Sequence, residues 1–216
     1  MIACYGGTFD PVHNGHLAAA EDVLTRAHCE EVRLIPCHRP PHRGRPLATS
    51  EQRLAMLRLA VQGRPGLVID DRELRRAGPS YTVDTLEALR TEMGPDVALG
   101  WVLGSDAFAE LDSWHRWQEL PRLAHLLVLE RPGSALPRLG PVGELLAERR
   151  VTDPRELHRV PAGLIWGVGQ RPMTVSATEV RRTLAGARSA SHLLPLPVWA
   201  YIEQVGLYDS NQAETE

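Results

Sequence analysis

The stretch from Tyr5 to Leu17, YGGTFDPVHNGHL, constrains the fold of this chain more than any other segment. It follows the short apolar run Ile2 to Cys4, which predicts a strand, and it precedes apolar residues that recur at helical spacing. The stretch is therefore the turn between a first strand and a first helix. Its paired glycines let the backbone come close to a ligand where a side chain would block the approach.

The same stretch predicts a phosphate site. We expect three main-chain N–H groups to face an anion, those of Gly7, Thr8 and Phe9. Asn14 is a suitable helix cap, and the N–H groups and positive dipole end beyond it attract anions. His13 and His16 are three residues apart, so both rings lie on the side of the helix that faces the turn.

Competing phosphate motifs are absent from the sequence. There is neither GxGxxG after a strand nor GxxxxGK followed by Ser or Thr, and the chain contains no lysine, which excludes a P-loop lysine. All 24 basic residues other than histidine are arginines, which indicates a composition bias rather than many local choices.

Strand-like and helix-like segments alternate along the rest of the chain. Further strands are predicted at Val32–Ile35, Leu67–Ile69, Val97–Leu103, His125–Glu130 and Leu164–Val168. Helices are expected after the first turn, from a Thr49–Gln52 capping box to about Val61, from Thr82 to Met93, from Val175 to Leu184 and from about Pro197 to Val205. In the second helix we expect a buried stripe of Leu54, Leu57 and Val61.

This alternation predicts an α/β fold: a Rossmann-like doubly wound parallel sheet with a small C-terminal helical portion. The length of 216 residues suits a single domain spanning residues 1–216. Residues 131–160 lose clear periodicity apart from a short helix at 142–149. The acidic tail at about 209–216 is expected to be disordered.

Two segments that follow strands carry groups suited to an anionic ligand, because the carboxyl ends of parallel strands converge on one crevice. The loop Pro36–Pro46 is rich in proline, arginine and histidine, and it is either an ordinary polar surface loop or a mobile basic loop that closes over phosphates. The segment Ser80–Thr82 leads into a helix start that could hold a second anion.

Later segments allow two interpretations each. Asp106, which follows the central strand, either meets a ribose hydroxyl or caps the helix Ala107–Leu111. Trp114 and Trp117 are expected on one helix face, with Trp117 in the core and Trp114 either in the core or stacked on a planar heterocycle.

Ser176 and Glu179 predict a capping box near the C-terminal end of the chain. Arg181 and Arg182, in the second turn of that helix, are compatible with that structural role and also lie where a triphosphate tail would reach.

Composition limits the classes of partner. A net charge of −3 and a pI near 6.3 argue against nonspecific nucleic-acid binding. No apolar run is long enough to cross a membrane and Met1 leads directly into the first strand, so we expect a soluble, cytoplasmic protein. The three cysteines suit a reducing compartment, and the spacing of His28, Cys29, Cys37, His38 and His42 does not assemble a usual zinc site, so we expect no resident metal.

The opening motif His13-Asn14-Gly15-His16 resembles the HxGH signature of the nucleotidyltransferase superfamily, whose histidines bind the phosphates of a nucleoside triphosphate. Further motifs occur in the order seen in bacterial nicotinate-mononucleotide adenylyltransferases, and they cover nearly the whole chain. They are PPHR, SYTVDTL, the GSD turn, the tryptophan after it, VSATEVR and PVWAYIEQVGLY. The resemblance implies an enzyme of NAD biosynthesis that joins ATP and nicotinate mononucleotide, giving deamido-NAD and pyrophosphate, with Mg²⁺ brought by ATP.

The resemblance also implies a role for individual residues. By this resemblance, the residues that make the catalytic contacts to phosphate are His13, His16, Arg43 and Arg181. The residues that make the other contacts to ATP are Gly7, Thr8, Phe9, Asp106 and Ser176. By the same resemblance, Tyr81 and Thr82 bind the pyridine carboxylate and Trp114 stacks on the pyridine ring. Two positions depart from the family pattern, which usually has Lys at Arg43 and Ser at Ala177. Arg43 keeps the charge, whereas Ala177 removes one hydroxyl contact.

Rival functions share the opening motif. Nicotinamide mononucleotide, phosphopantetheine or glycerol 3-phosphate are alternative acceptors, and a nucleotide-binding regulatory module without turnover is a rival of another class. The presence of both histidines and of the phosphate-facing arginines favours an enzyme.

Overall fold

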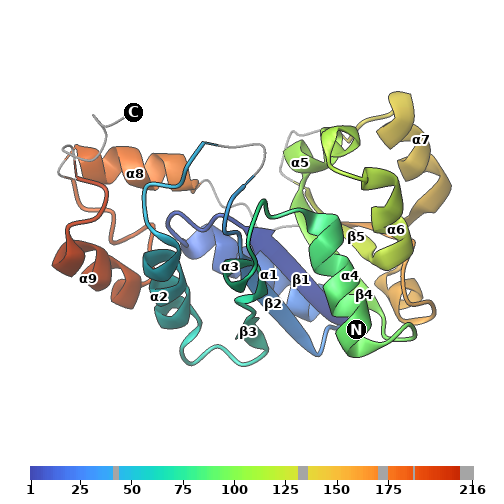
Figure 1. The fold of residues 1–216 in the computed structure, drawn as a ribbon, viewed down its shortest axis with the longest axis horizontal. Helices are drawn as coiled ribbons and strands as arrows, with labels where there is room; N and C mark the ends of the chain where they lie inside the picture. The colour runs from blue at the N-terminus through green and yellow to red at the C-terminus, as the bar shows by residue number, and fades with distance from the viewer. Residues whose placement is uncertain (41–43, 131–135, 170–174, 187, 210–216) are drawn as a thin grey trace.

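The computed structural model describes residues 1–40, 44–130, 136–169, 175–186 and 188–209 (Figure 1). Within these ranges the chain forms a seven-stranded, all-parallel sheet in the order β3-β2-β1-β4-β5-β7-β6. The strands are β1 Ile2–Gly7, β2 Glu31–Pro36, β3 Leu67–Ile69, β4 Leu99–Gly104, β5 His125–Glu130, β6 Arg150–Val151 and β7 Ile165–Gly169. The predicted strands are therefore confirmed, two of them with the expected ends and the others with ends that move by at most three residues.

The helices in the described ranges are α1 Asn14–Arg26, α2 Ser50–Val61, α3 Arg72–Arg75, α4 Thr82–Met93, α5 Ser105–Ala109, α6 Leu120–Leu123, α7 Gly140–Arg149, α8 Ala177–Ala185 and α9 Leu196–Val205. Single 3₁₀ turns lie at η1 Leu111–Ser113 and η2 Trp117–Glu119, and a slightly longer one at η3 Pro154–His158. None of these helices is long and apolar enough to cross a membrane.

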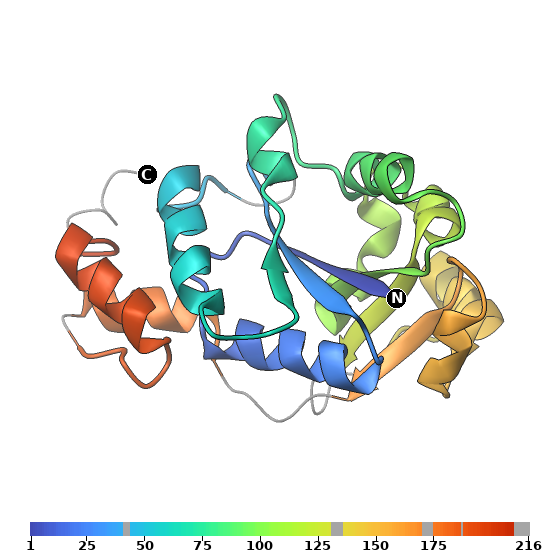
Figure 2. The same ribbon diagram turned by 90° about the horizontal axis from the view of Figure 1, so that it is seen from below.

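Side chains of the central strands alternate between two hydrophobic cores, one on each face of the sheet. Ala3, Leu34 and Val102 belong to the core that also contains residues of α1, α2 and α9. Their chain neighbours Cys4, Ile35 and Leu103 belong to the core that contains residues of α4, α5 and α7. Both faces of the strands are covered, which explains the continuous apolar runs in the sequence (Figures 1 and 2). The prediction of a doubly wound α/β fold is confirmed.

The order of the strands reverses between β1 and β4. From β1 the chain passes through α1 to β2 on one side, whereas from β4 it continues to β5 on the other side. The crevice outside the carboxyl ends of two such strands is where open α/β sheets bind ligands. The turn after β1 and the turn after β4 flank that crevice.

The C-terminal portion consists of α8 and α9, and α9 packs against α2. In Figure 1 both helices lie at the end of the molecule beside α2, away from α6 and α7. A small C-terminal helical portion was expected and is confirmed. Most of the acidic tail, residues 210–216, lies outside the described residues.

Several expectations about helices were wrong. The buried residues of α2 are Arg53, Met56, Leu57 and Ala60, so the buried stripe is turned from the one expected and includes an arginine. The helix expected at Ala107–Leu111 begins earlier, at Ser105, because Gly104 takes the extended capping conformation. The short helix expected at 142–149 is confirmed as α7, but the rest of residues 136–160 is more regular than expected, because it also contains η3 and the edge strand β6.

Trp114 and Trp117 do not share a helix face. Trp114 ends η1 in an extended conformation, and Arg116 follows with a left-handed φ of 52° before η2 begins. This reversal separates the two indoles, and both are partly buried against the core on the α4 side.

His125 allows a test of the fold through pH. It is fully buried at the start of β5, with Nε2 3.0 Å from the Val160 carbonyl oxygen and Nδ1 accepting the Leu164 N–H at 3.1 Å. One nitrogen donates and the other accepts, so the ring is neutral, and burial lowers its pKa below the ordinary value of 6.5. As pH falls below 6.5, the unfolded chain takes up a proton that the folded chain does not. Stability is therefore lost, by up to about 1.4 kcal/mol per pH unit.

Urea unfolding at pH 7.5 and pH 5.5 measures this loss. The variant His125→Asn is expected to be less stable at pH 7.5 and to show a smaller loss between the two values than the unchanged protein. The control His115→Asn, on an exposed ring, should keep the original pH dependence. An equal pH dependence in the His125 variant would contradict this assignment.

Candidate active site

The turn after β1 is closed by a reciprocal pair of histidine contacts. Nδ1 of His13 accepts the N–H of His16, and Nδ1 of His16 accepts the N–H of His13, both at 3.3 Å. His13 is therefore the cap of α1, which corrects the expected cap at Asn14. The reason is conformational: His13 is extended, with φ −141° and ψ 170°, whereas Asn14 is already helical and its side chain donates to the His192 carbonyl.

The capping contacts assign the tautomers of both rings. Each Nδ1 accepts a hydrogen bond, so in the neutral form each ring carries its proton on Nε2. The rings stack with centroids 3.7 Å apart and an interplanar angle of 25°. His13 is buried and His16 is half-buried. The two imidazoles, each with its Nε2–H as a donor, therefore lie side by side just after the carboxyl end of β1.

Aromatic side chains hold His16 in place. The ring of Phe9 meets it edge to face at 5.0 Å, and the ring of Tyr5 lies at 6.1 Å. Phe9 is buried and has a left-handed φ of 50°, which reverses the backbone directly after Thr8. The three predicted phosphate-facing residues, Gly7, Thr8 and Phe9, therefore lie in one tight turn beside the two imidazoles.

The two glycines also permit close contacts within the chain. A Cβ at Gly6 would lie 2.5 Å from the Trp101 ring, and one at Gly7 would lie 3.0 Å from the Phe9 ring. Position 6 requires a glycine because the buried indole of β4 occupies the space that a side chain would need. The close approach is thus between the chain and itself.

The start of α8 lies against the start of α1. A Cβ at Gly15 would lie 2.8 Å from Val175, so this glycine permits the contact. The exposed Ser176 caps α8 by accepting the N–H of Glu179 at 3.2 Å, as predicted. Arg181 donates to the carbonyl of Asp10 at 2.7 Å, which places its guanidinium next to the turn after β1.

The other predicted binding residues gather at the start of α4. Tyr81 is the N-terminal cap residue and Thr82 begins the helix, and Tyr81 makes no side-chain capping bond. The first N–H groups of a helix have no partner within it, so this end attracts an anion. The Tyr81 ring lies 4.3 Å from that of His115.

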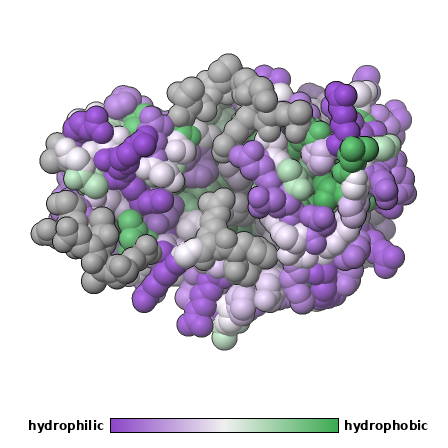
Figure 3. Space-filling view, turned by 90° about the horizontal axis from the view of Figure 1, so that it is seen from above, coloured by the Kyte–Doolittle hydropathy of each residue, from purple (hydrophilic) through white to green (hydrophobic). Residues whose placement is uncertain are grey.

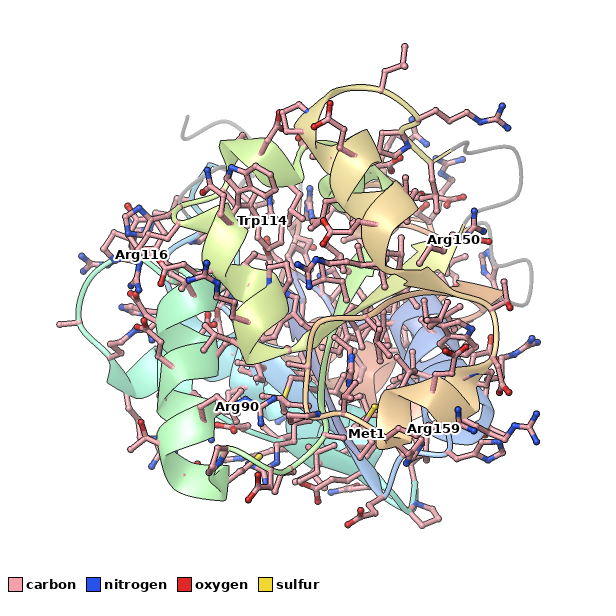
Figure 4. All side chains as sticks on the ribbon, turned by 90° about the vertical axis from the view of Figure 1, so that its right-hand side faces the viewer. Met1, Arg90, Trp114, Arg116, Arg150 and Arg159 are labelled. Carbon is pink, nitrogen blue, oxygen red and sulfur yellow. The ribbon has the colours of Figure 1, made fainter. Side chains whose placement is uncertain are left out.

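An ion-pair network ties the segment that contains Trp114 to α4. Arg116 donates to Glu87 on α4 at 2.6 Å and to Glu119 at 2.7 Å. Figure 4 shows Trp114 and Arg116 in the same part of the molecule, well away from Met1 and Arg90. Hydrogen bonds to both carboxylates raise the pKa of Arg116.

A buried carboxyl group lies beneath the start of α4. Glu73 accepts the hydroxyl of Thr85 at 2.7 Å, and burial raises its pKa. Arg76 donates to the same hydroxyl at 3.2 Å and to the Tyr81 carbonyl at 3.4 Å. Arg76 therefore links the backbone at Tyr81 to the buried Thr85 and Glu73 side chains.

Asp106 and the basic loop complete the list of predicted residues. Asp106 is exposed in the first turn of α5, directly after β4. Gly104 is the cap of that helix, so the expected capping role of Asp106 is wrong. Arg43 lies outside the described residues. Figure 3, which views the molecule from above, shows the surface hollowed between the C-terminal helices and the part that holds α5.

Among the described residues there is no cluster of three or more His, Cys, Asp or Glu side chains that could hold a metal ion. The turn after β1 instead gathers hydrogen-bond donors: two imidazoles, one guanidinium and backbone N–H groups. Donors of this kind bind phosphate and stabilise charge that develops on it.

Known proteins resemble this chain along its whole length. The model of the family described as cytidylyltransferase-like matches residues 4–183. A protein of Marinobacter nauticus named "Probable nicotinate-nucleotide adenylyltransferase" is 47% identical over 214 residues, covering 99% of both chains. One of the same name from Pseudomonas putida is 50% identical over 207 residues, covering 96% of this chain and 94% of the relative. The chain belongs to the nicotinate-nucleotide adenylyltransferase family.

Members of this family are enzymes, so the family membership confirms the class of protein predicted from the motifs. A solved structure of Plasmodium falciparum nicotinic acid mononucleotide adenylyltransferase, complexed with NaAD, matches with a TM-score of 0.73. It covers 96% of both chains at 17% sequence identity, so this likeness supports the fold.

Three residues around the turn after β1 were missed by sequence reasoning: Asp10, Arg53 and Tyr208. The carboxylate of Asp10 is buried and accepts the N–H groups of Leu47 and Ala48 at 2.9 and 3.0 Å and the Tyr208 hydroxyl at 2.7 Å. Arg53 donates to the Thr8 carbonyl at 2.6 Å. The sequence contained one signal that Arg53 is buried: it has helical spacing with Leu57 and Ala60, so it interrupts an otherwise apolar helix face.

Proposed function

We propose that this protein transfers the adenylyl group of ATP to nicotinate mononucleotide, giving deamido-NAD and pyrophosphate. The observation that carries the proposal is the stacked pair His13 and His16, whose reciprocal capping engages Nδ1 of each ring and leaves Nε2–H as the donor side of each imidazole, in the turn that follows β1. The names of the relatives support the choice of substrates.

In the proposed reaction a phosphate oxygen of nicotinate mononucleotide attacks the α-phosphorus of ATP. The new P–O bond forms as the bond from the α-phosphorus to the bridging oxygen breaks, and pyrophosphate leaves with that electron pair. A phosphate monoester is already ionised near neutral pH, so no general base is needed. Catalysis then depends on alignment and on donors facing the charge that builds up.

We assign the donors from the resemblance to the family. His16 makes the main contact to the α-phosphate in the transition state, with His13, Arg43 and Arg181 sharing the charge of the other phosphates. The N–H groups of Gly7, Thr8 and Phe9 contact the nucleotide, Ser176 lies at the β,γ-phosphate end, and Asp106 meets the adenosine ribose. The bond from Arg181 to the Asp10 carbonyl supports its placement beside the turn.

Mg²⁺ enters this reaction as part of the ATP substrate. It would neutralise charge on the β- and γ-phosphates and on the leaving pyrophosphate. His16 then acts on the α-phosphate, while the other donors face the phosphates that leave as pyrophosphate. We also propose a cytoplasmic location, which the thiol state of the three cysteines supports.

The pyridine carboxylate is proposed to bind the N–H groups of Tyr81 and Thr82 at the start of α4, with Trp114 stacked on the ring. The position of Tyr81 as a cap without a side-chain bond supports this, because it leaves helix N–H groups to be satisfied by a ligand. Donors prefer a carboxylate to a carboxamide, whose NH₂ group would face them.

Steady-state kinetics with the two mononucleotides tests the proposal. With ATP and Mg²⁺, release of pyrophosphate is expected to be at least about tenfold more efficient, in kcat/KM, with nicotinate than with nicotinamide mononucleotide, because an N–H donor left facing an amide NH₂ is a costly mismatch. Efficient turnover of nicotinamide mononucleotide or phosphopantetheine instead would reassign the acceptor. An absence of pyrophosphate with any acceptor would favour a regulatory nucleotide-binding module.

A further inference from the structure

Arg53 is an unusual residue for the core of an α/β enzyme. It lies in the first turn of α2, it is 1% exposed, and within the described chain its Nε has no hydrogen-bond partner. Burial of a guanidinium is costly unless the group is paired and hydrogen-bonded. The mechanism proposed above does not use this cation, so its cost calls for another role.

The polar contacts of Arg53 point to the phosphate-binding turn. Nη1 donates to the Thr8 carbonyl at 2.6 Å, directly before Phe9 with its left-handed φ of 50°. A carbonyl held in this way fixes the plane of the peptide that joins Thr8 to Phe9. The N–H of Phe9 belongs to that peptide, so Arg53 sets the direction in which this donor points.

The other side of the same turn is fixed by Asp10. Its carboxylate accepts two N–H groups from the segment that enters α2 and the hydroxyl of Tyr208. Asp10 also attracts the Arg53 cation, which opposes the lowering of the Arg53 pKa by burial. Burial and the charge of Asp10 raise the pKa of Tyr208, which therefore remains a donor. Arg53 thus holds the turn at the Thr8 carbonyl, and Asp10 holds it through the contacts of its own carboxylate.

A second branch of contacts runs from Arg53 to the other half of the site. Nη2 donates to Ser50 Oγ at 3.2 Å, and this oxygen lies 3.0 Å from Nδ1 of His38. The N–H of His38 in turn donates to Ser80 Oγ at 3.0 Å, one residue before Tyr81. Ser80 also donates its own N–H to the Arg39 carbonyl at 3.0 Å.

We propose that Arg53 is a positioning residue that sets the phosphate-binding turn through the Thr8 carbonyl and carries the same constraint, through Ser50 and His38, to the segment before α4. The inference rests on the proposed function, because the two ends of this network are the proposed sites of ATP and of the mononucleotide. In this proposal, a single buried cation, Arg53, aligns the two substrates with each other. Alignment of two reactants is the main source of rate in a direct displacement.

The test compares Arg53→Met with Arg90→Met. Arg90 is a matched control, because its guanidinium also binds backbone carbonyls, those of Leu123, Val97 and Pro161 at 2.6, 2.6 and 2.7 Å. It lies in the last turn of α4, at the end opposite Tyr81 and Thr82 and away from Trp114 (Figure 4). Both variants are expected to melt at lower temperature, but only Arg53→Met should raise the KM for ATP and lower kcat, each about fivefold, in protein shown to be folded. Arg53→Lys, which keeps the charge and one donor to Thr8, should recover part of the loss.

Ser50→Ala gives a second, milder test, because it breaks the branch toward Ser80 and leaves the bond to Thr8. We expect the KM for nicotinate mononucleotide to rise about threefold and the KM for ATP to stay within twofold. The inference is overturned if Arg53→Met, once folded, has all kinetic constants within twofold of the unchanged protein. If Arg53→Met does not fold, the inference is overturned when both Arg53→Lys and Ser50→Ala have all kinetic constants within twofold of the unchanged protein.

The affinity for ATP alone, measured by titration calorimetry, separates this inference from the proposed function. If the unchanged protein does not turn over nicotinate mononucleotide, the proposed function fails. A weaker affinity for ATP in Arg53→Met than in Arg90→Met would still support the positioning role. Equal affinities in the two variants would refute it.

Discussion

Replacement of His16 by alanine is expected to lower kcat about 100-fold to 1,000-fold, the usual cost of removing one donor that faces charge in a transition state. The Nε2–H of His16 is the group removed, and the stacked partner His13 remains. The same substitution also deletes the acceptor of the His13 N–H, which is one of the two capping contacts of α1. A loss of about 1 kcal/mol in stability is therefore expected beside the kinetic effect.

Two further variants separate the kinetic effect from the capping effect. His16→Asn keeps an acceptor near the position of Nδ1 and lacks a donor near Nε2, so it should recover stability without rate. His16→Gln extends an amide toward the Nε2 position and should recover part of the rate. Single-turnover assays and thermal melting measure the two quantities. Near-normal turnover by folded His16→Ala would rule out the assigned role.

Replacement of Arg181 by methionine is expected to reduce kcat/KM for ATP about 10-fold to 100-fold, because a hydrogen bond to a charged group contributes about 1.5–3 kcal/mol. Arg181 is half-buried beside the turn after β1, where its bond to the Asp10 carbonyl limits its freedom before ATP arrives. The KM for nicotinate mononucleotide should change much less, since the proposed partner of Arg181 is the departing end of ATP.

Arg182→Met is the matched control for this substitution. Arg182 is the next residue of α8 and is exposed, so it shares helix, charge and length with Arg181 but not its position. Its removal should leave kcat/KM for ATP within twofold. Equal losses in the two variants would mean that α8 acts through its general positive charge and that Arg181 has no specific contact.

The chain of strands and helices was predictable because local signals agree with the final fold. The apolar strands carry no alternation, since both of their faces are covered, and capping residues mark the starts of α2 and α8. The turn after β1 was predictable for the same reason: its glycines and histidines are adjacent in sequence, so their mutual position follows from one strand-turn-helix unit.

The residues that fix that turn were not predictable in the same way, because their partners are distant in sequence. Arg53 meets Thr8, and Tyr208 meets Asp10, only after the sheet has brought α2 and the C-terminal segment beside β1. The arrangement of Trp114 and Trp117 failed for a different reason. Their spacing fits a helix, but the left-handed backbone at Arg116 is stabilised by ion pairs with Glu87 and Glu119, and Glu87 comes from another helix.

The bond from Tyr208 to Asp10 has a consequence for how the protein is made. Asp10 is synthesised 198 residues before Tyr208, which follows every strand of the described sheet. A nascent chain that already contains all these strands therefore still lacks one of the contacts that fix the catalytic turn. Activity should emerge only after Tyr208 has been synthesised, and fragments that stop before α9 should lack competent enzyme.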